Sequence, residues 1–205
     1  MLRDKAITEL LELACPSIKY RIKAEILGQS TSHKDLVELQ SQILQDPTIK
    51  EVINWQQPDG WLGWDFHGAK SIETGIRILC EKGVHRCHPA LAKALEALER
   101  YPDRLGRGIG KVGKLLDEKG FGGSLMIRAT VFAYAGVEEK PFVEEQVDAA
   151  LGGFEAVLDV ASVEELVEEY KGKLVFKPNV QWPSIIILGC WLSHTHGARQ
   201  KTREW

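Results

Sequence analysis

Apolar residues recur along this chain every three or four positions, which is the spacing of helices that are covered on one side. The first 45 residues contain three such patterns, at Leu2, Ala6, Leu10 and Leu13, at Ile18, Ile22, Ile26 and Leu27, and at Leu36, Leu39, Ile43 and Leu44. We expect Cys15-Pro16 to end the first helix and Gly28 to end the second. Strand-like alternation is nearly absent, and its one short candidate, residues 173–176, should form an extended loop.

Three longer segments share one order of elements. Each begins with a helix led by proline, which is favoured at the first helical position, and the three starts are Asp46-Pro47, His88-Pro89 and Lys140-Pro141. A loop rich in glycine or aromatic residues follows, and then a more apolar helix that ends near a glycine; these helices are expected over 72–82, 125–135 and 184–195. The pattern predicts N-terminal helices over 1–45 and helix-pair repeats over 46–87, 88–139 and 140–197.

The two helices of each repeat differ in their polarity. Residues 89–100 carry a one-sided apolar stripe with charged residues opposite it, which is typical of an outer, solvated helix. The second helix is apolar nearly all round, as in residues 185–191, and should be buried or line a cavity. Outer helices around inner helices predict a single all-α domain over 1–205, with helical-hairpin repeats in an α/α toroid-like or curved solenoid array.

One turn resembles a known family. Gln56-Gln57-Pro58-Asp59-Gly60-Trp61, followed by Gly63-Trp64, resembles the Gln/Trp-rich turn of squalene (terpenoid) cyclases and prenyltransferases, and residues 75–79 and 129–136 are similar to that family's inner helices. The resemblance implies an α/α toroid with a concave, aromatic-lined face for an apolar or isoprenoid-like molecule. The family's acidic motifs, Asp-x-Asp-Asp and Asp-Asp-x-x-Asp, are absent, and no cysteine has Asp two residues before it. The resemblance therefore implies a fold and a cavity rather than an activity.

The turn also has a direct physical interpretation. Pro58 fixes its own φ, Asp59 can form a hydrogen bond with its own backbone, and Gly60 can adopt positive φ. The nearby tryptophans either hold adjacent helix pairs together or line a pocket. The candidate ligand-binding residues are Trp61, Trp64, Arg77, Arg128 and Trp182, and the two arginines lie near corresponding positions of successive inner helices.

Asp59, Asp65 and His67 are the candidate catalytic residues, because a carboxylate and an imidazole near a cavity mouth can act as acid and base. Structural ion pairs or helix caps explain the same residues. Cys87, His88, His194 and His196 are weak candidates for a metal site, because zinc needs four convergent ligands or three ligands and a water. The alternative is that the histidines lie at helix ends and interact with the helix dipole, so no metal site is predicted.

Residues 106–115 contain a GxGxxG and a near Walker A pattern. Leu115 replaces the Ser or Thr that binds magnesium, and no strand precedes the segment, which favours a surface connection or a basic loop that meets an anion. The acidic residues Glu164, Glu165, Glu168 and Glu169 should form a solvated helix face.

Charge and cysteine content limit the functional classes. The 205-residue chain has a formal net charge of −3 and a pI near 6.1, which disfavours nucleic-acid binding, since that requires clustered Lys and Arg. The four cysteines include no CxxC pair, and the charged N-terminus lacks a signal-peptide stretch, so we expect reduced thiols and a cytoplasmic location. The longest apolar run, 185–191, is too short to span a membrane.

These observations favour a ligand-binding or scaffold protein without cyclase chemistry. The first alternative is an enzyme related to prenyltransferases or terpene cyclases that acts on an isoprenoid or other apolar substrate by acid–base chemistry. The second alternative is a HEAT-like binder of protein or nucleic acid, for which the basic residues between Arg104 and Lys114 are the only support. The residues indicate neither a cofactor nor an oligomeric state.

Overall fold

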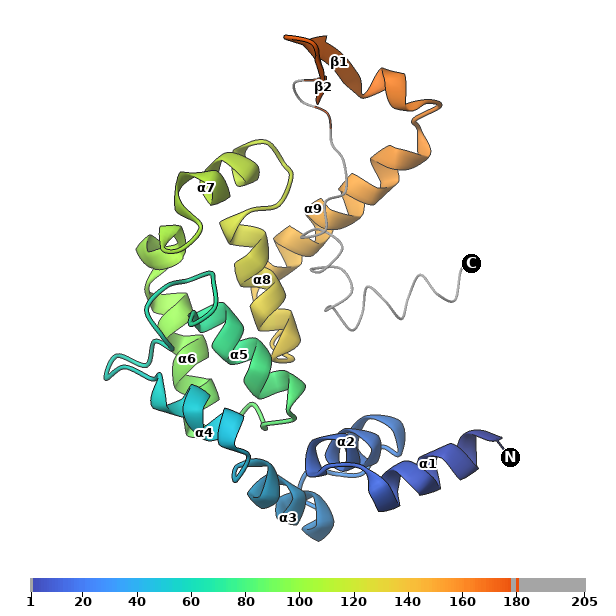
Figure 1. The fold of residues 1–205 in the computed structure, drawn as a ribbon, viewed down its shortest axis with the longest axis vertical. Coiled ribbons are helices and arrows are strands. Elements are labelled where there is room, and N and C mark those ends of the chain that lie inside the picture. The colour runs from blue at the N-terminus through green and yellow to red at the C-terminus, as the bar shows by residue number, and fades with distance from the viewer. Residues whose placement is uncertain (1, 178–179, 181–205) are drawn as a thin grey trace. The chain divides into compact units, whose positions relative to one another are not determined.

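The computed structural model describes residues 2–177 and 180 (Figure 1), and this part of the chain is mostly helical, as predicted. It contains nine α-helices, short π- and 3₁₀-helices, and one two-stranded sheet. The predicted helix 184–195 and the candidates Trp182, His194 and His196 lie outside the described residues. The chain divides into two compact units: unit 1 comprises 1–65 and 69–101, and unit 2 comprises 66–68 and 102–205.

Unit 1 begins with the three predicted N-terminal helices. They are α1 (Leu2–Leu13), α2 (Pro16–Arg21), which continues as a π-helix (Ile22–Ile26), and α3 (Lys34–Ile43). Pro16 starts α2 and Gly28, with φ of 65°, follows the π-helix, as expected. The apolar stripe of α1 is less covered than its pattern suggests, because Leu10 and Leu13 are 46% and 85% exposed.

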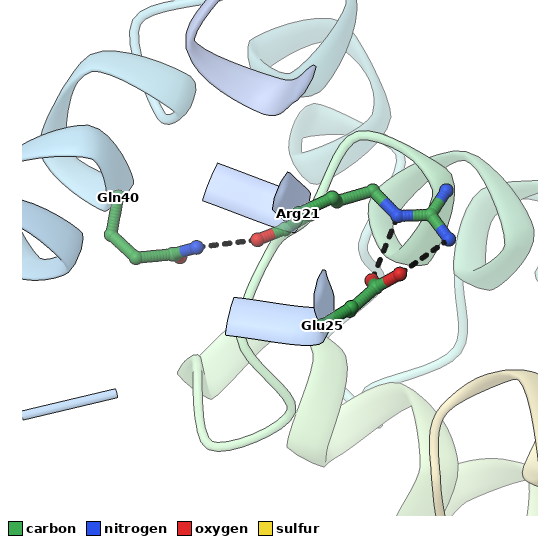
Figure 2. A network of polar contacts seen from close by, with 4 residues as sticks. Arg21, Glu25 and Gln40 are labelled. Carbon is green, nitrogen blue, oxygen red and sulfur yellow. Dashed lines mark hydrogen bonds and ion pairs between the residues drawn. The ribbon is translucent and has the colours of Figure 1, made fainter. Parts of the chain in front are cut away.

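A polar network ties these helices to the rest of unit 1. The side-chain amide of Gln40, on α3, donates to the carbonyl oxygen of Gly83 and accepts from the backbone N–H of His85 at 3.1 Å. Figure 2 shows this side chain together with a second polar contact, in which the guanidinium of Arg21 binds the carboxylate of Glu25 at 2.8 and 3.1 Å. Gln40 therefore joins α3 to the turn that follows α5, and its role is structural.

The remaining helices of unit 1 are α4 (Pro47–Asn54), α5 (Ile72–Glu81) and α6 (Pro89–Arg100). Helix α5 packs against both α4 and α6. The predicted proline starts are confirmed: Asp46 caps α4 by accepting from Thr48 N at 2.8 Å, and His88 Nδ1 caps α6 by accepting from Ala90 N at 3.3 Å. The predicted stripe of α6 is also confirmed, since Leu91, Ala94, Leu95 and Leu98 are all buried.

Unit 2 is built around α8 (Ser124–Tyr134), which packs against a 3₁₀-helix (Pro102–Gly106), α7 (Gly110–Glu118) and α9 (Pro141–Leu158). The proline start at Pro141 and the apolar helix predicted over 125–135 are both confirmed. Helix α8 is buried over most of its surface, because the buried side chains on it include Met126, Ile127, Val131 and Phe132. No helix among the described residues is both long enough and apolar enough to cross a membrane.

Two local predictions in unit 2 are wrong. Residues 173–176 form a strand, β2 (Lys173–Phe176), which pairs antiparallel with β1 (Val167–Tyr170). The acidic residues do not form a helix face: Glu164 and Glu165 lie in a 3₁₀-helix (Val163–Glu165), and Glu168 and Glu169 lie in β1. Residues 171–172, both with positive φ, form a tight turn that brings the two strands together. The glutamates before this turn have helical spacing, and for that reason the sequence pattern indicates a helix there instead of a hairpin.

The three predicted repeats differ in the segment that joins their two helices. In 46–87 this segment is an irregular loop, in 88–139 it contains the 3₁₀-helix Pro102–Gly106 and α7, and after α9 it contains the β-hairpin. Helix α7 was not predicted, because its two glycines, Gly110 and Gly113, are poor helix formers.

Candidate functional site

The Gln/Trp-rich turn is a structural connection inside unit 1. Trp61 N donates to Asp59 Oδ1 at 3.0 Å, which is the local hydrogen bond that the sequence predicts. The side-chain amide of Gln56 donates to the carbonyl oxygens of Gly60, at 3.0 Å, and Ala90, at 2.7 Å. Gly60 has φ of 91°, and a Cβ there would lie 2.7 Å from the carbonyl oxygen of Lys93. The turn is thereby bound tightly to the first turns of α6.

The candidate tryptophans have opposite environments. Trp61 is fully buried, with 0% exposure, and its Nε1 donates to the carbonyl oxygen of Asp65 at 3.3 Å. Trp64 is 74% exposed. Trp55 is half-buried and makes a cation–π contact with Lys70, whose ammonium nitrogen lies 5.7 Å from the ring centroid. Trp61 therefore acts as a core residue of unit 1.

The three candidate catalytic residues are not brought into one site by either unit. The carboxylate of Asp59 accepts a hydrogen bond from Trp61 N within the turn. Asp65 is exposed, and its carbonyl oxygen accepts hydrogen bonds from the indole N–H of Trp61 and the backbone N–H of Ile72. His67 is exposed and belongs to unit 2, where its backbone N–H donates to the carbonyl oxygen of Arg107 at 3.3 Å. Each residue thus has a position that local structure explains.

The two candidate arginines also make structural contacts. Arg77, on α5, forms an exposed ion pair with Glu81 at 3.5 Å. Arg128, on α8, lies over the ring of Phe142 with its guanidinium carbon 4.1 Å from the centroid, and Phe142 meets Phe132 edge-on at 5.0 Å. Arg128 thus joins α8 to α9 through a cation–π contact.

The structure favours capping over metal binding at His88. The imidazole caps the N-terminus of α6 through Nδ1, and burial lowers its pKa below the usual value, which keeps it in the neutral form that can accept. Cys87 is exposed, and its backbone N–H donates to His85 Nδ1 at 3.3 Å. Within 2–177 and 180, no three His, Cys, Asp or Glu side chains come together as metal ligands would.

A pocket of about 770 Å³ lies in unit 2, where the 3₁₀-helix Pro102–Gly106, α7 and the start of α8 meet. Its apolar side chains are Pro102, Leu105 and Leu125, and its charged ones are Lys111, Lys114, Asp117 and Glu118. Gly106, Gly110 and Ser124 are the other lining residues within the described part of the chain. This volume is within the range of small-molecule sites, which are mostly apolar with a few polar groups.

Small residues hold the walls of this pocket together. A Cβ on Gly113 would overlap Ser124 Oγ and lie 2.9 Å from Ile109 Cγ2, and a Cβ on Gly123 would overlap the carbonyl oxygen of Gly113. The carboxylate of Asp117 then caps α8 by accepting from Gly123 N at 2.9 Å and from Leu125 N at 3.3 Å. Helices α7 and α8 can approach this closely only because both glycines lack a side chain.

The near Walker A pattern is explained by this packing. A P-loop places its Gly-Lys pair at the entrance of a helix, where backbone N–H groups face the phosphates. Here α7 begins at Gly110, so that Gly113 and Lys114 lie inside the helix, and Gly113 is buried against Ser124. The expected surface connection over 106–115 is therefore partly wrong, because most of the segment is helical.

Among the pocket residues, Lys111 lies in the basic segment 106–115 for which contact with an anion was one expectation, whereas the sequence pattern does not single out Leu105 or Leu125 as site residues. The helical spacing of Val112, Leu115 and Leu116 was the available signal, but the surrounding glycines and lysines favoured a loop. Comparisons with protein-family models, with curated proteins and with solved structures give no match to this chain.

Proposed function

We propose that this chain is a ligand-binding module, and that the pocket of unit 2 takes the apolar part of a small amphipathic molecule. The observation that carries the proposal is a pocket of ligand size with three apolar side chains, Pro102, Leu105 and Leu125, in its wall. Leu125 is 46% exposed, so that a bound molecule would remove apolar surface from water on both sides of the contact.

Binding is favoured over catalysis by the chemistry of the lining. Among the described residues that line the pocket there is neither a histidine nor a cysteine. Its two carboxylates are engaged: Asp117 caps α8, and Glu118 lies 3.8 Å from the ammonium of Lys114. Asp59 and Asp65 belong to unit 1, and His67 is not among the lining residues.

We also propose that the helix pairs are repeats of the squalene-cyclase and prenyltransferase type, arranged as in an α/α toroid, and that the ligand is isoprenoid-like. Three proline-led helices and the Gln/Trp-rich turn support this assignment. Without the family's acidic motifs, such a module would hold or present an apolar molecule instead of cyclising it.

Farnesol, an uncharged isoprenoid alcohol, tests the proposal by calorimetric titration of the full chain. Replacing Leu125 by Asn makes the pocket wall polar, and Leu115→Asn is the matched control, because Leu115 lies on α7 with 48% exposure and does not line the pocket. We expect Leu125→Asn to weaken binding about three- to tenfold, since complete burial of a leucine contributes roughly 1.5–3 kcal/mol and a ligand can cover only the exposed half of Leu125. Leu115→Asn should leave the affinity unchanged.

Circular dichroism of both variants separates a local effect from unfolding. Both side chains are half exposed, so that both variants should melt close to the wild-type temperature. Equal affinities of wild type and Leu125→Asn, or equal losses in the two variants, would refute the assignment of the pocket.

A further inference from the structure

The pocket in unit 2 has a charge pattern that limits what its ligand can carry. In the part of the lining that the structure describes there are two ammonium and two carboxylate groups, at Lys111, Lys114, Asp117 and Glu118. Lys114 pairs with Glu118, with 3.8 Å between Nζ and Oε1, and Asp117 is held by the backbone N–H groups of Gly123 and Leu125. Among the residues that the structure describes, the ammonium of Lys111 has neither a hydrogen-bond partner nor an ion-pair partner.

The surroundings of Lys111 add to its positive potential. It lies in the first turn of α7, which contains no acidic residue, and the N-cap residue Ile109 has no side-chain oxygen to offer. The positive end of the helix dipole therefore acts in the same place as the ammonium. Helix α8 differs, because Asp117 already supplies the carboxylate at its N-terminus.

The two carboxylates set an upper limit to the charge of the ligand. A group with two or more negative charges at Lys111 would meet Asp117 and Glu118 across the same pocket, with only one uncommitted ammonium to balance it. A group with one negative charge gains the attraction of Lys111 and adds less repulsion.

On this basis, and resting on the proposed function, we infer that the ligand is a monoanionic amphiphile, a long-chain carboxylic acid in chemical class, whose carboxylate binds Lys111 while its chain lies against Leu105 and Leu125. The pocket supplies both parts of the recognition: an apolar wall for the chain and one uncommitted ammonium for the head.

Three molecules with the same twelve-carbon tail test the charge of the head: dodecanoate, dodecan-1-ol and dodecyl phosphate. Calorimetry with the full chain at pH 7.5 should show dodecanoate binding about fivefold more tightly than dodecanol, which is the size of an exposed ion pair. Dodecyl phosphate, mostly a dianion at this pH, should bind no more tightly than dodecanoate.

Lys111→Gln should remove the preference for dodecanoate over dodecanol and leave the affinity for dodecanol unchanged. Lys119→Gln is the matched control, because it removes the same charge from an exposed lysine directly after α7 that does not line the pocket. It should leave all three affinities as they are.

Each contrary result has a distinct meaning. Equal wild-type affinities for dodecanoate and dodecanol, tighter binding of dodecyl phosphate, or equal effects of Lys111→Gln and Lys119→Gln would overturn the inference and leave the proposed function standing. Failure of all three molecules to bind, together with no effect of Leu125→Asn on farnesol, would overturn both.

Discussion

The Gln/Trp-rich turn over 56–64 contains two tryptophans, three residues apart, that should respond in opposite ways to truncation. Trp61 heads the set of large side chains that are fully buried, and its backbone and indole N–H groups both donate within the turn. Trp64 is 74% exposed. The two residues share one chemistry and one segment of chain, so that a difference between their alanine variants reports the burial of Trp61 together with the hydrogen bond of its indole.

Trp61→Ala should lower the free energy of unfolding of unit 1 by about 3–5 kcal/mol, since it removes a complete indole from a packed site and leaves a cavity. For a domain of this size, each kcal/mol shifts the melting temperature by about 4–8 °C, so that a fall of at least about 12 °C is expected. Trp64→Ala should change stability by less than about 0.5 kcal/mol.

Thermal unfolding followed by circular dichroism measures both variants. Because Trp61→Ala can prevent folding of unit 1 altogether, Trp61→Phe provides an intermediate step. The phenyl ring refills most of the volume but loses the 3.3 Å hydrogen bond to Asp65, and should cost about 1–2 kcal/mol. Equal losses for Trp61→Ala and Trp64→Ala, or a Trp61→Phe variant as stable as wild type, would refute the burial argument.

Two further predictions concern other parts of the chain. Gly123→Ala should destabilise unit 2 by about 1–3 kcal/mol, because the new methyl group would overlap the carbonyl oxygen of Gly113. Gly152→Ala, in open space on α9, should instead stabilise unit 2 by up to about 1 kcal/mol. Hydrogen exchange of the amides of α7 and α8 distinguishes the two variants, and faster exchange in both would contradict the prediction. The hydrogen bond from Lys82 holds the pKa of Asp46 below its usual value, so that its contribution to stability is present above about pH 4 and is lost as the pH falls through the folded-state value. Asp46→Asn, which keeps an oxygen to cap α4, should flatten the decline in melting temperature between pH 5 and pH 2, and an unchanged decline would exclude this pair as a cause.

The sequence predicted the helices that begin with a strong local signal. Pro47, Pro89 and Pro141 each start a helix, because proline at the first position has the required φ and no backbone N–H to satisfy. Asp59 also forms the predicted local hydrogen bond to Trp61. These features depend on residues that are close together in the sequence, and for that reason the sequence alone predicts them.

The hairpin and α7 were missed because their signals are not local. Residues 173–176 show a short strand-like alternation, but β1 contains Glu168 and Glu169 and shows none, and the backbone hydrogen bonds of the two strands form only when the turn brings them together. Helix α7 contains two glycines whose helical cost is offset by close packing on α8, and the Gly113–Ser124 contact appears only when both helices are in place.

By itself, then, the sequence determined the helical class, the proline-led starts and the geometry of the Gln/Trp-rich turn. Only the tertiary structure decided that Trp61 is core and Trp64 is exposed, and that Leu105, Lys111 and Leu125 line one pocket. The physical reason is that helix starts and turns are governed by backbone dihedral angles and neighbouring hydrogen bonds. Burial and pocket formation depend on which surfaces meet, and residues 20 positions apart meet only after the helices have packed.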